Sequence, residues 1–313
     1  MRPLVLVSAV LLLVVAVAAL IACNPSASTK TIPPTPQHLY VAGTSIAQYT
    51  LPLTSTSTPN FNLAASNITG LALDPSGNLV TLDSNTSTVS VYDAPLSASS
   101  TAAVSFNCPT VGVSTAVDSA GDVFVSGWGA TDVGWGDIFV FDPPLSNSST
   151  VATTLNLNPY LPAGLLIAGL VFDSNGNLIV ASNFGTSTGG VSLSVLAPPY
   201  TGAPSVITPP ISGNGYSGLA INGTQLFAVG NAAVDVYSLP LTSSSAPTFS
   251  ITSPSPSPQE IAFDKSGNMY IGTTYGKLQV FAPPFSSTST PTVTLTLSTG
   301  GLEWDILGLA ITQ

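Results

Sequence analysis

The segment GLALDPSGNLVTLD, residues 70–83, decides the fold of this chain. Two short apolar stretches flank a turn in which Asp74 can accept a hydrogen bond from the backbone two residues on, and Gly77 tolerates a positive φ. Two apolar runs around such a turn predict a β-hairpin. Related segments occupy 114–127, 169–182, 218–230 and 260–273, so the hairpin recurs every 42 to 55 residues. A period in this range with several short strands per unit is typical of β-propeller blades.

A second phrase follows each hairpin and predicts the third strand of the blade. It reads VYDAP at 91–95, VFDPP at 140–144 and VFAPP at 280–284, and related versions occur at 48–52, 195–199 and 236–240. Proline ends each strand because it cannot continue a hydrogen-bonded ladder. A Ser/Thr-rich stretch comes next, and then a run such as TVTL at 292–295 forms a solvated outer strand.

The two ends of the repeat region complete the count of blades. Residues 38–53 match the second and third strands of a blade and lack the first, whereas residues 307–313 match a first strand alone. We therefore expect an all-β, six-bladed propeller of four-stranded antiparallel blades, closed by pairing of the C-terminal strand with the N-terminal strands. An open solenoid is the alternative, but it would not need complementary half-repeats at its ends.

The G-L-A-x-D-x-x-G-N-L pattern resembles the NHL-repeat family and, more broadly, the six-bladed propellers that include streptogramin lyase and relatives of gluconolactonase. Resemblance to the lyase implies a histidine pair, but the chain has one histidine, His38, which lies before the hairpins. Resemblance to gluconolactonases implies a divalent metal held by Glu, Asn and Asp at the channel mouth. The early E-G-P-x-W-like signature of those enzymes is missing, so we assign no catalytic residue.

The N-terminus predicts export and lipidation. Arg2 precedes an apolar run from Leu4 to Ile21, as in a secretion signal. The residues just before Cys23 resemble a bacterial lipobox, which implies a signal peptide over 1–22 and acyl chains on Cys23 that anchor the protein in the membrane. An uncleaved anchor helix and a cleaved signal without lipidation are the alternatives. Residues 23–37 are a polar tether, the propeller spans 38–313, and Asn24 favours the outer membrane or cell surface.

The composition excludes nucleic acid as a partner and an internal disulfide bond as a cross-link. Charged residues make up 6% of the chain and the net charge is −10, with no basic cluster, so we predict no binding to nucleic acid. With Cys23 assigned to lipidation, Cys108 has no cysteine partner, and we interpret it as a buried structural thiol. We expect the protein to be a monomer.

Candidate ligand-binding residues lie in irregular loops that gather on one face of the predicted ring. Exposed aromatic rings beside carboxylates and amides can stack on a sugar or hold a peptide. Aligning the repeats places Glu260 in a column of Gly70, Ser114, Gly169, Gly218 and Gly308, so its carboxylate would point toward the channel mouth. The candidates are Trp128, Asp132, Trp135, Glu260, Glu303, Trp304 and Asp305. The alternative interpretation is that the rings cap the channel and Glu260 occupies a wet channel.

These features predict a lipid-anchored, extracytoplasmic binding module for a saccharide, a peptide or a protein. A metal-dependent lactonase or hydrolase that uses Glu260, and a structural envelope protein without a small ligand, are the alternatives. We predict no cofactor, although Glu260 leaves room for a divalent cation such as Ca²⁺ at the channel mouth. The D-x-x-G-N turns are not assigned as calcium loops, because Gly falls at the fourth position and no glutamate follows at the twelfth.

Overall fold

The computed structural model describes residues 36–65, 67–128, 136–160, 165–184, 192–201, 203–207, 215–230, 232–252, 257–299, 302–303 and 305–313. Pro36–Gln313 forms one compact unit. Strands dominate it, and the helical structure among these residues is a 3₁₀ turn at Thr274–Gly276 (η1). In this part of the chain no helix has the length and apolar character needed to cross a membrane.

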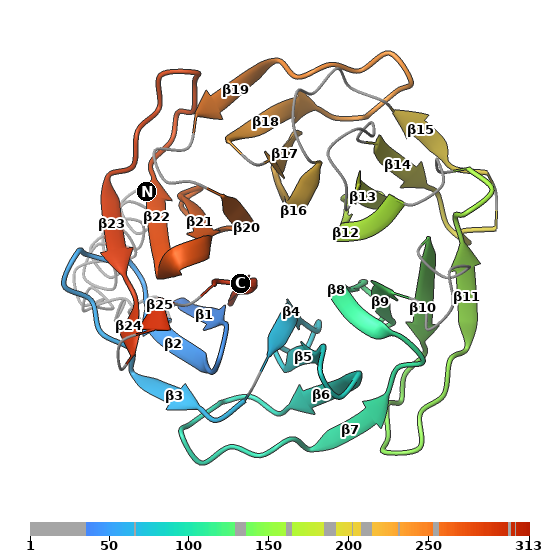
Figure 1. The fold of residues 1–313 in the computed structure, drawn as a ribbon, viewed down its shortest axis with the longest axis horizontal. Helices are drawn as coiled ribbons and strands as arrows, with labels where there is room; N and C mark the ends of the chain where they lie inside the picture. Colours follow the sequence, from blue (N-terminus) through green and yellow to red (C-terminus); the bar gives the residue numbers. More distant parts are fainter. Residues whose placement is uncertain are drawn as a thin grey trace, which may run out of the picture. The chain divides into compact units, whose positions relative to one another are not determined.

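Six four-stranded antiparallel sheets make up the compact unit and surround a central axis (Figure 1). Blade 1 contains β26 (Gly308–Ile311), β1 (His38–Ala42), β2 (Ile46–Thr50) and β3 (Phe61–Leu63). Blade 2 contains β4 (Ile68–Leu73), β5 (Leu79–Asp83), β6 (Thr88–Tyr92) and β7 (Val104–Asn107). Blade 3 contains β8 (Val111–Val117), β9 (Val123–Trp128), β10 (Asp137–Phe141) and β11 (Thr153–Asn156).

The other three blades repeat this order. Blade 4 contains β12 (Leu165–Phe172), β13 (Leu178–Phe184), β14 (Ser192–Leu196) and β15 (Ser205–Ile207). Blade 5 contains β16 (Tyr216–Asn222), β17 (Gln225–Gly230), β18 (Ala233–Ser238) and β19 (Phe249–Thr252). Blade 6 contains β20 (Pro258–Phe263), β21 (Met269–Thr273), β22 (Lys277–Phe281) and β23 (Val293–Thr296), and a short pair, β24 (Ser298–Thr299) with β25 (Leu302–Glu303), follows it.

The ring closes as the half-repeats predict. Strand β26 pairs antiparallel with β1, with Leu39 opposite Ile311 and Ala42 opposite Gly308. In Figure 1 the first and last coloured strands accordingly share one blade. The inner strand of each blade also contacts the inner strands of its two neighbours, from β4 around to β26. The prediction of a closed six-bladed propeller is confirmed, and the open solenoid is wrong.

The D-x-x-G-N turns are built as the sequence predicts. The Asp74 carboxylate accepts hydrogen bonds from the backbone N–H groups of Ser76 and Asn78, both at 2.8 Å, and from the Asn78 side chain at 2.8 Å. Gly77 has φ +84°. Equivalent backbone bonds recur at Asp118, Asp173 and Asp264. These carboxylates therefore hold the hairpin between the first and second strands.

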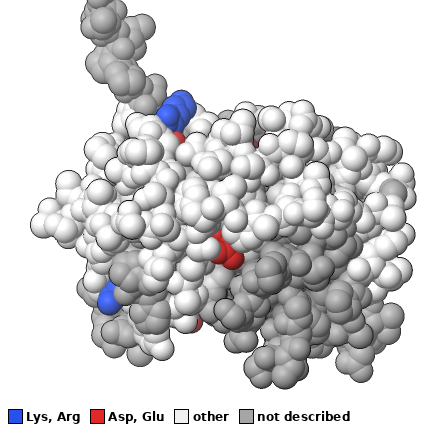
Figure 2. Space-filling view, turned by 90° about the horizontal axis from the view of Figure 1, so that it is seen from above, with Lys and Arg blue, Asp and Glu red and all other residues white. Residues whose placement is uncertain are grey.

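Each third strand ends at an X-Pro bond, and all six of these bonds are cis. A hydroxyl-rich turn follows. In blade 2, the Ser97 N–H donates to the Ser100 hydroxyl at 2.9 Å, and the Ser100 N–H donates to the Ser97 carbonyl at 3.1 Å. The same pair of bonds recurs in four other blades, beginning at Thr54, Ser146, Thr242 and Ser286. Charged side chains of the described residues are few and scattered on the surface (Figure 2).

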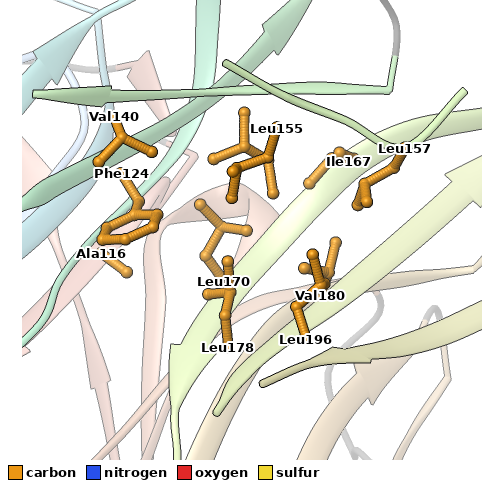
Figure 3. Close-up of a cluster of buried hydrophobic side chains, with 11 residues drawn as sticks. Ala116, Phe124, Val140, Leu155, Leu157, Ile167, Leu170, Leu178, Val180 and Leu196 are labelled. Carbon is orange, nitrogen blue, oxygen red and sulfur yellow. The ribbon is translucent and has the colours of Figure 1, made fainter. Parts of the chain in front are cut away.

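The hydrophobic core is divided into six clusters, each lying between two adjacent blades. Figure 3 shows the cluster between blades 3 and 4, where Phe124 and Val140 face Leu170 and Leu178. Leu39 and Leu309 belong to the cluster that joins blade 6 to blade 1. Each blade therefore buries its apolar faces against its neighbours, and closing the ring completes the last cluster.

Candidate functional site at the channel mouth

A β-bulge interrupts the first strand of five blades at the same place. The register with the second strand shifts between Ile68 and Gly70, and between Pro258 and Glu260, so that one residue is left over. Equivalent shifts occur in β8, β12 and β16. Bulges re-aim side chains and are frequent next to binding sites. The extra residues are Thr69, Val113, Ala168, Ser217 and Gln259.

All five bulge residues line one cavity of about 400 Å³ at the mouth of the channel. Leu307 completes the circle from blade 1, and Val111 and Leu166 add apolar surface. The side chain of Val111 is 48% exposed, which is high for a valine beside a cavity. The fold therefore surrounds a mainly apolar mouth cavity with residues from all six blades.

A smaller chamber of about 70 Å³ lies one residue further along the inner strands. Gly70, Ser114, Gly169, Gly218 and Glu260 line it, which are five members of the aligned column. The glycines leave backbone uncovered there, so this chamber is more polar than the mouth cavity. Its far side is formed by Leu71, Thr115, Leu170, Leu219, Ile261 and Leu309.

Glu260 lines both the mouth cavity and the inner chamber. Its side chain is half-buried, and one of its carboxylate oxygens lies 3.3 Å from where a Cβ on Gly218 would stand. A side chain on Gly218 would also come within 2.7 Å of the Gln259 carbonyl. Glycine at 218 thus leaves the space in which the carboxyl group sits. Glu260 therefore lines the channel, and its role as a ligand-binding residue stays a prediction.

Burial raises the pKa of Glu260 well above its usual value, because removing water disfavours the charged carboxylate. A hydrogen bond from the Ile261 N–H acts in the opposite direction and is the smaller effect. Among the described residues that line the two cavities, Glu260 is the single titratable side chain. The channel therefore contains a carboxyl group whose charge depends strongly on what lies beside it.

A third cavity, of about 1060 Å³, opens at the opposite end of the channel. The D-x-x-G-N turns line it, including Asp74, Asp118 and Asp264, together with the C-terminal residues 309–313. Their carboxylates already accept turn hydrogen bonds, as described above. The lining of this end of the channel is therefore accounted for by the hairpin turns that the blades share.

The structure separates the other candidate residues from Glu260 or leaves them outside the described residues. Asp132, Trp135 and Trp304 lie outside that part of the chain, as do the side chains of Trp128 and Glu303. The backbone of Trp128 pairs with Val111, which lines the mouth cavity. Asp305 is exposed, accepts a hydrogen bond from the Tyr275 N–H at 3.3 Å, and lines a different cavity of about 190 Å³ between blades 6 and 1. Asp305 and Glu260 therefore do not share a cavity.

A metal at the mouth would need more oxygen ligands than Glu260 supplies, since Ca²⁺ takes about six to eight. Among the described side chains, no group of three or more His, Cys, Asp and Glu is arranged to hold a metal ion. Cys108 is buried, and desolvation of its thiolate raises its pKa to about 11, which keeps it as an unreactive thiol.

The sequence pattern pointed to Glu260, but it did not predict the mainly apolar lining of the mouth cavity. The missed residues are those just before the column at 70, 114, 169, 218 and 260, and each of them is the extra residue of a bulge. Period-two alternation alone would have pointed these residues into the sheet packing. A bulge becomes visible only when the register with the second strand is known.

Comparisons with known proteins identify the fold. No protein-family model and no curated protein matches the chain. A periplasmic gluconolactonase from Pseudomonas aeruginosa is similar in structure, with a TM-score of 0.62 and 14% identity over 89% of this chain and 99% of that one. A putative 6-phosphogluconolactonase from Bacteroides fragilis has a TM-score of 0.64 and 10% identity over 93% and 100% of the two chains. A protein from Lactobacillus plantarum has a TM-score of 0.59 and 14% identity over 89% and 100%. The chain is a six-bladed β-propeller whose structural neighbours include gluconolactonase-like propellers.

Proposed function

We propose that this protein is an extracytoplasmic, lipid-anchored binding module that takes up a ligand through the mouth of its channel. The observation that carries the proposal is the mouth cavity of about 400 Å³, which is mainly apolar and has one carboxyl group at its base. Ligand sites are typically concave and apolar, with a few polar groups that orient the ligand. The cavity fits that description with residues from every blade.

The ligand class in this proposal is a saccharide, a peptide or an exposed segment of a protein partner. The backbone of Trp128 is paired with that of Val111, which lines the mouth cavity. Anchoring through Cys23, with residues 23–37 as a tether, would hold the propeller near the envelope surface. The sequence features of the N-terminus support this part of the proposal.

Binding is tested by a thermal-shift screen of glycans and peptides against the purified propeller. A ligand that binds the native state raises the melting temperature. Val113→Trp fills the mouth cavity, and Ala168→Leu fills it less severely in case the first variant folds poorly. Ligands that stabilise the wild type and lose their effect in either folded variant support the proposal, whereas ligands that stabilise all three proteins equally contradict it.

A metal-dependent lactonase is the second candidate, favoured by the gluconolactonase names of two structural neighbours and by the carboxyl group in the channel. Its test is hydrolysis of aldonolactones with Ca²⁺, Mg²⁺, Mn²⁺ or Zn²⁺ added. Turnover that depends on a metal and is lost in Glu260→Gln would favour the enzyme. Turnover at the uncatalysed rate with every metal would reject it.

A further inference from the structure

Two spaces of different size and polarity, which share Thr69 and Glu260 in their walls, make up the proposed binding site. The mouth cavity of about 400 Å³ is mainly apolar, and the inner chamber of about 70 Å³ is mainly polar, with Gly70, Gly169 and Gly218 among the residues in its wall. Since a water molecule occupies about 30 Å³ in the liquid, the inner chamber has room for a group the size of two or three waters. A ligand that fills both spaces therefore has an apolar body and a small polar end.

The column that contains Glu260 indicates the charge of that polar end. At Gly70, Gly169 and Gly218 a Cβ would lie 2.9, 3.2 and 2.7 Å from atoms of the next blade, so close packing of the blades favours glycine at this level of the channel. Ser114 already supplies a neutral hydroxyl at the same level. Glu260 adds a property that serine lacks, which is a negative charge when the carboxyl group ionises.

No described side chain that lines the two cavities carries a positive charge to balance Glu260. The described residues that line the two cavities come from the inner strands of all six blades and from Ser84 and Leu307, and none of them is a lysine, arginine or histidine. A half-buried carboxylate that has lost part of its hydration without gaining a cation is costly, and an ammonium group placed against it removes much of that cost. The net charge of −10 on the chain also raises the local concentration of cations.

Resting on the proposed function, we propose that the ligand carries a protonated amine on an apolar body. The apolar body occupies the mouth cavity, and the ammonium group enters the inner chamber against the Glu260 carboxylate. Binding shifts Glu260 toward its ionised form, so one proton is released to solvent wherever the free protein holds the carboxyl group neutral.

Hexylamine, 1-hexanol and hexanoate test this inference, because they share one apolar chain and differ in the terminal group. Isothermal titration of the wild type at pH 7.5 should give at least tenfold tighter binding of hexylammonium than of 1-hexanol, and hexanoate should bind more weakly than both. Glu260→Gln should reduce hexylammonium affinity at least tenfold and leave hexanol affinity within about threefold. Asp93→Asn removes an exposed carboxylate outside the channel and should change neither affinity.

The pH dependence gives a second readout. Hexylammonium affinity should fall as the pH is lowered through the pKa of Glu260, by up to about tenfold per pH unit, because one proton competes with the ligand. Hexanol affinity should not follow this trend. Glu260→Gly, which copies the other blades, should remove the pH dependence if the Gln variant folds poorly.

The failures of the two proposals are distinguishable. If hexanol binds as tightly as hexylammonium and Val113→Trp abolishes both, the binding site stands and the amine inference is wrong. If no hexyl probe binds while a glycan or peptide does, the amine inference is likewise wrong. Stabilisation by CaCl₂ that is lost in Glu260→Gln, without amine binding, would replace the amine with a metal. Absence of binding by every probe and every library member would overturn both proposals.

Discussion

At the scale of single residues, Glu260 stands where the other blades have glycine or serine. Gly218 in the neighbouring blade leaves room for its carboxyl group, and the Ile261 N–H provides a partial compensation for burial. An acidic side chain in this setting lowers the stability of the folded state, and the propeller architecture does not require an acid there. Such local exceptions to a repeated pattern are commonly sites of function.

Stability should depend on pH through this residue. Because the folded-state pKa of Glu260 is raised above its unfolded value, its ionisation favours the unfolded chain. The stability is complete below the unfolded pKa and is lost as the pH rises toward the folded pKa. Glu260→Gln should therefore match the stability of the wild type near pH 4 and exceed it at pH 8, where the wild type must keep the Glu260 carboxyl group protonated or leave its charge poorly solvated.

Urea denaturation of both proteins at pH 4, 6 and 8 measures this difference. Asp93→Asn serves as the control because Asp93 is exposed and lines neither the mouth cavity nor the inner chamber. A constant difference between Glu260→Gln and wild type across the three pH values would show that the carboxyl group is not desolvated.

At the scale of elements, β26 is the strand on which ring closure depends. It supplies Leu309, Ala310 and Ile311 to the blade, all buried, and pairs with β1 over four residues. Without it, β1 would present an unpaired inner edge to the channel, and the cluster between blades 6 and 1 would lose two of its members, Leu309 and Ile311.

Ending the chain at Leu307 should lower the melting temperature by at least about 10 °C, because two large apolar side chains are lost at about 2–5 kcal/mol each and 1 kcal/mol moves the midpoint by about 2–4 °C. A peptide of residues 305–313 added in trans should recover part of the loss by pairing with β1. Removal of the exposed Gln313 alone is the control and should change little. A truncated protein that melts like the wild type would contradict the role given to β26.

The blades were predictable from the sequence because the residues that form their turns and end their strands act locally. Asp74 and Gly77 fix a hairpin within five residues, and Pro95 ends a strand by itself. The boundaries of the strands can therefore be read from single residues of the repeat. The bulges were not predictable because they depend on the offset between two strands. Thr69 and Gln259 reach the mouth cavity only because a register shift turns them there. The tryptophan loops have no repeat to align, so their contribution to the site stays a prediction.

At the scale of the whole molecule, the proposed anchoring depends on a single thiol near the N-terminus. When the chain is expressed in a Gram-negative host, the wild type should partition into detergent and incorporate labelled palmitate, because acyl chains on Cys23 bind the protein to the membrane. Cys23→Ala should lose the label. Cys108→Ala should keep it, since Cys108 is buried in the fold. A label that persists in Cys23→Ala would reject the lipoprotein assignment.

The division of the core into six shared clusters bears on how such a chain can evolve. A newly duplicated stretch of about one repeat gains no stability until the faces on either side of it fit, because each cluster is built jointly by adjoining blades. Loss of one repeat would likewise bring together two faces that were never selected to meet. A change in blade number would therefore require new packing at the interfaces on both sides of the altered blade, whereas substitutions at the channel mouth leave the shared clusters intact.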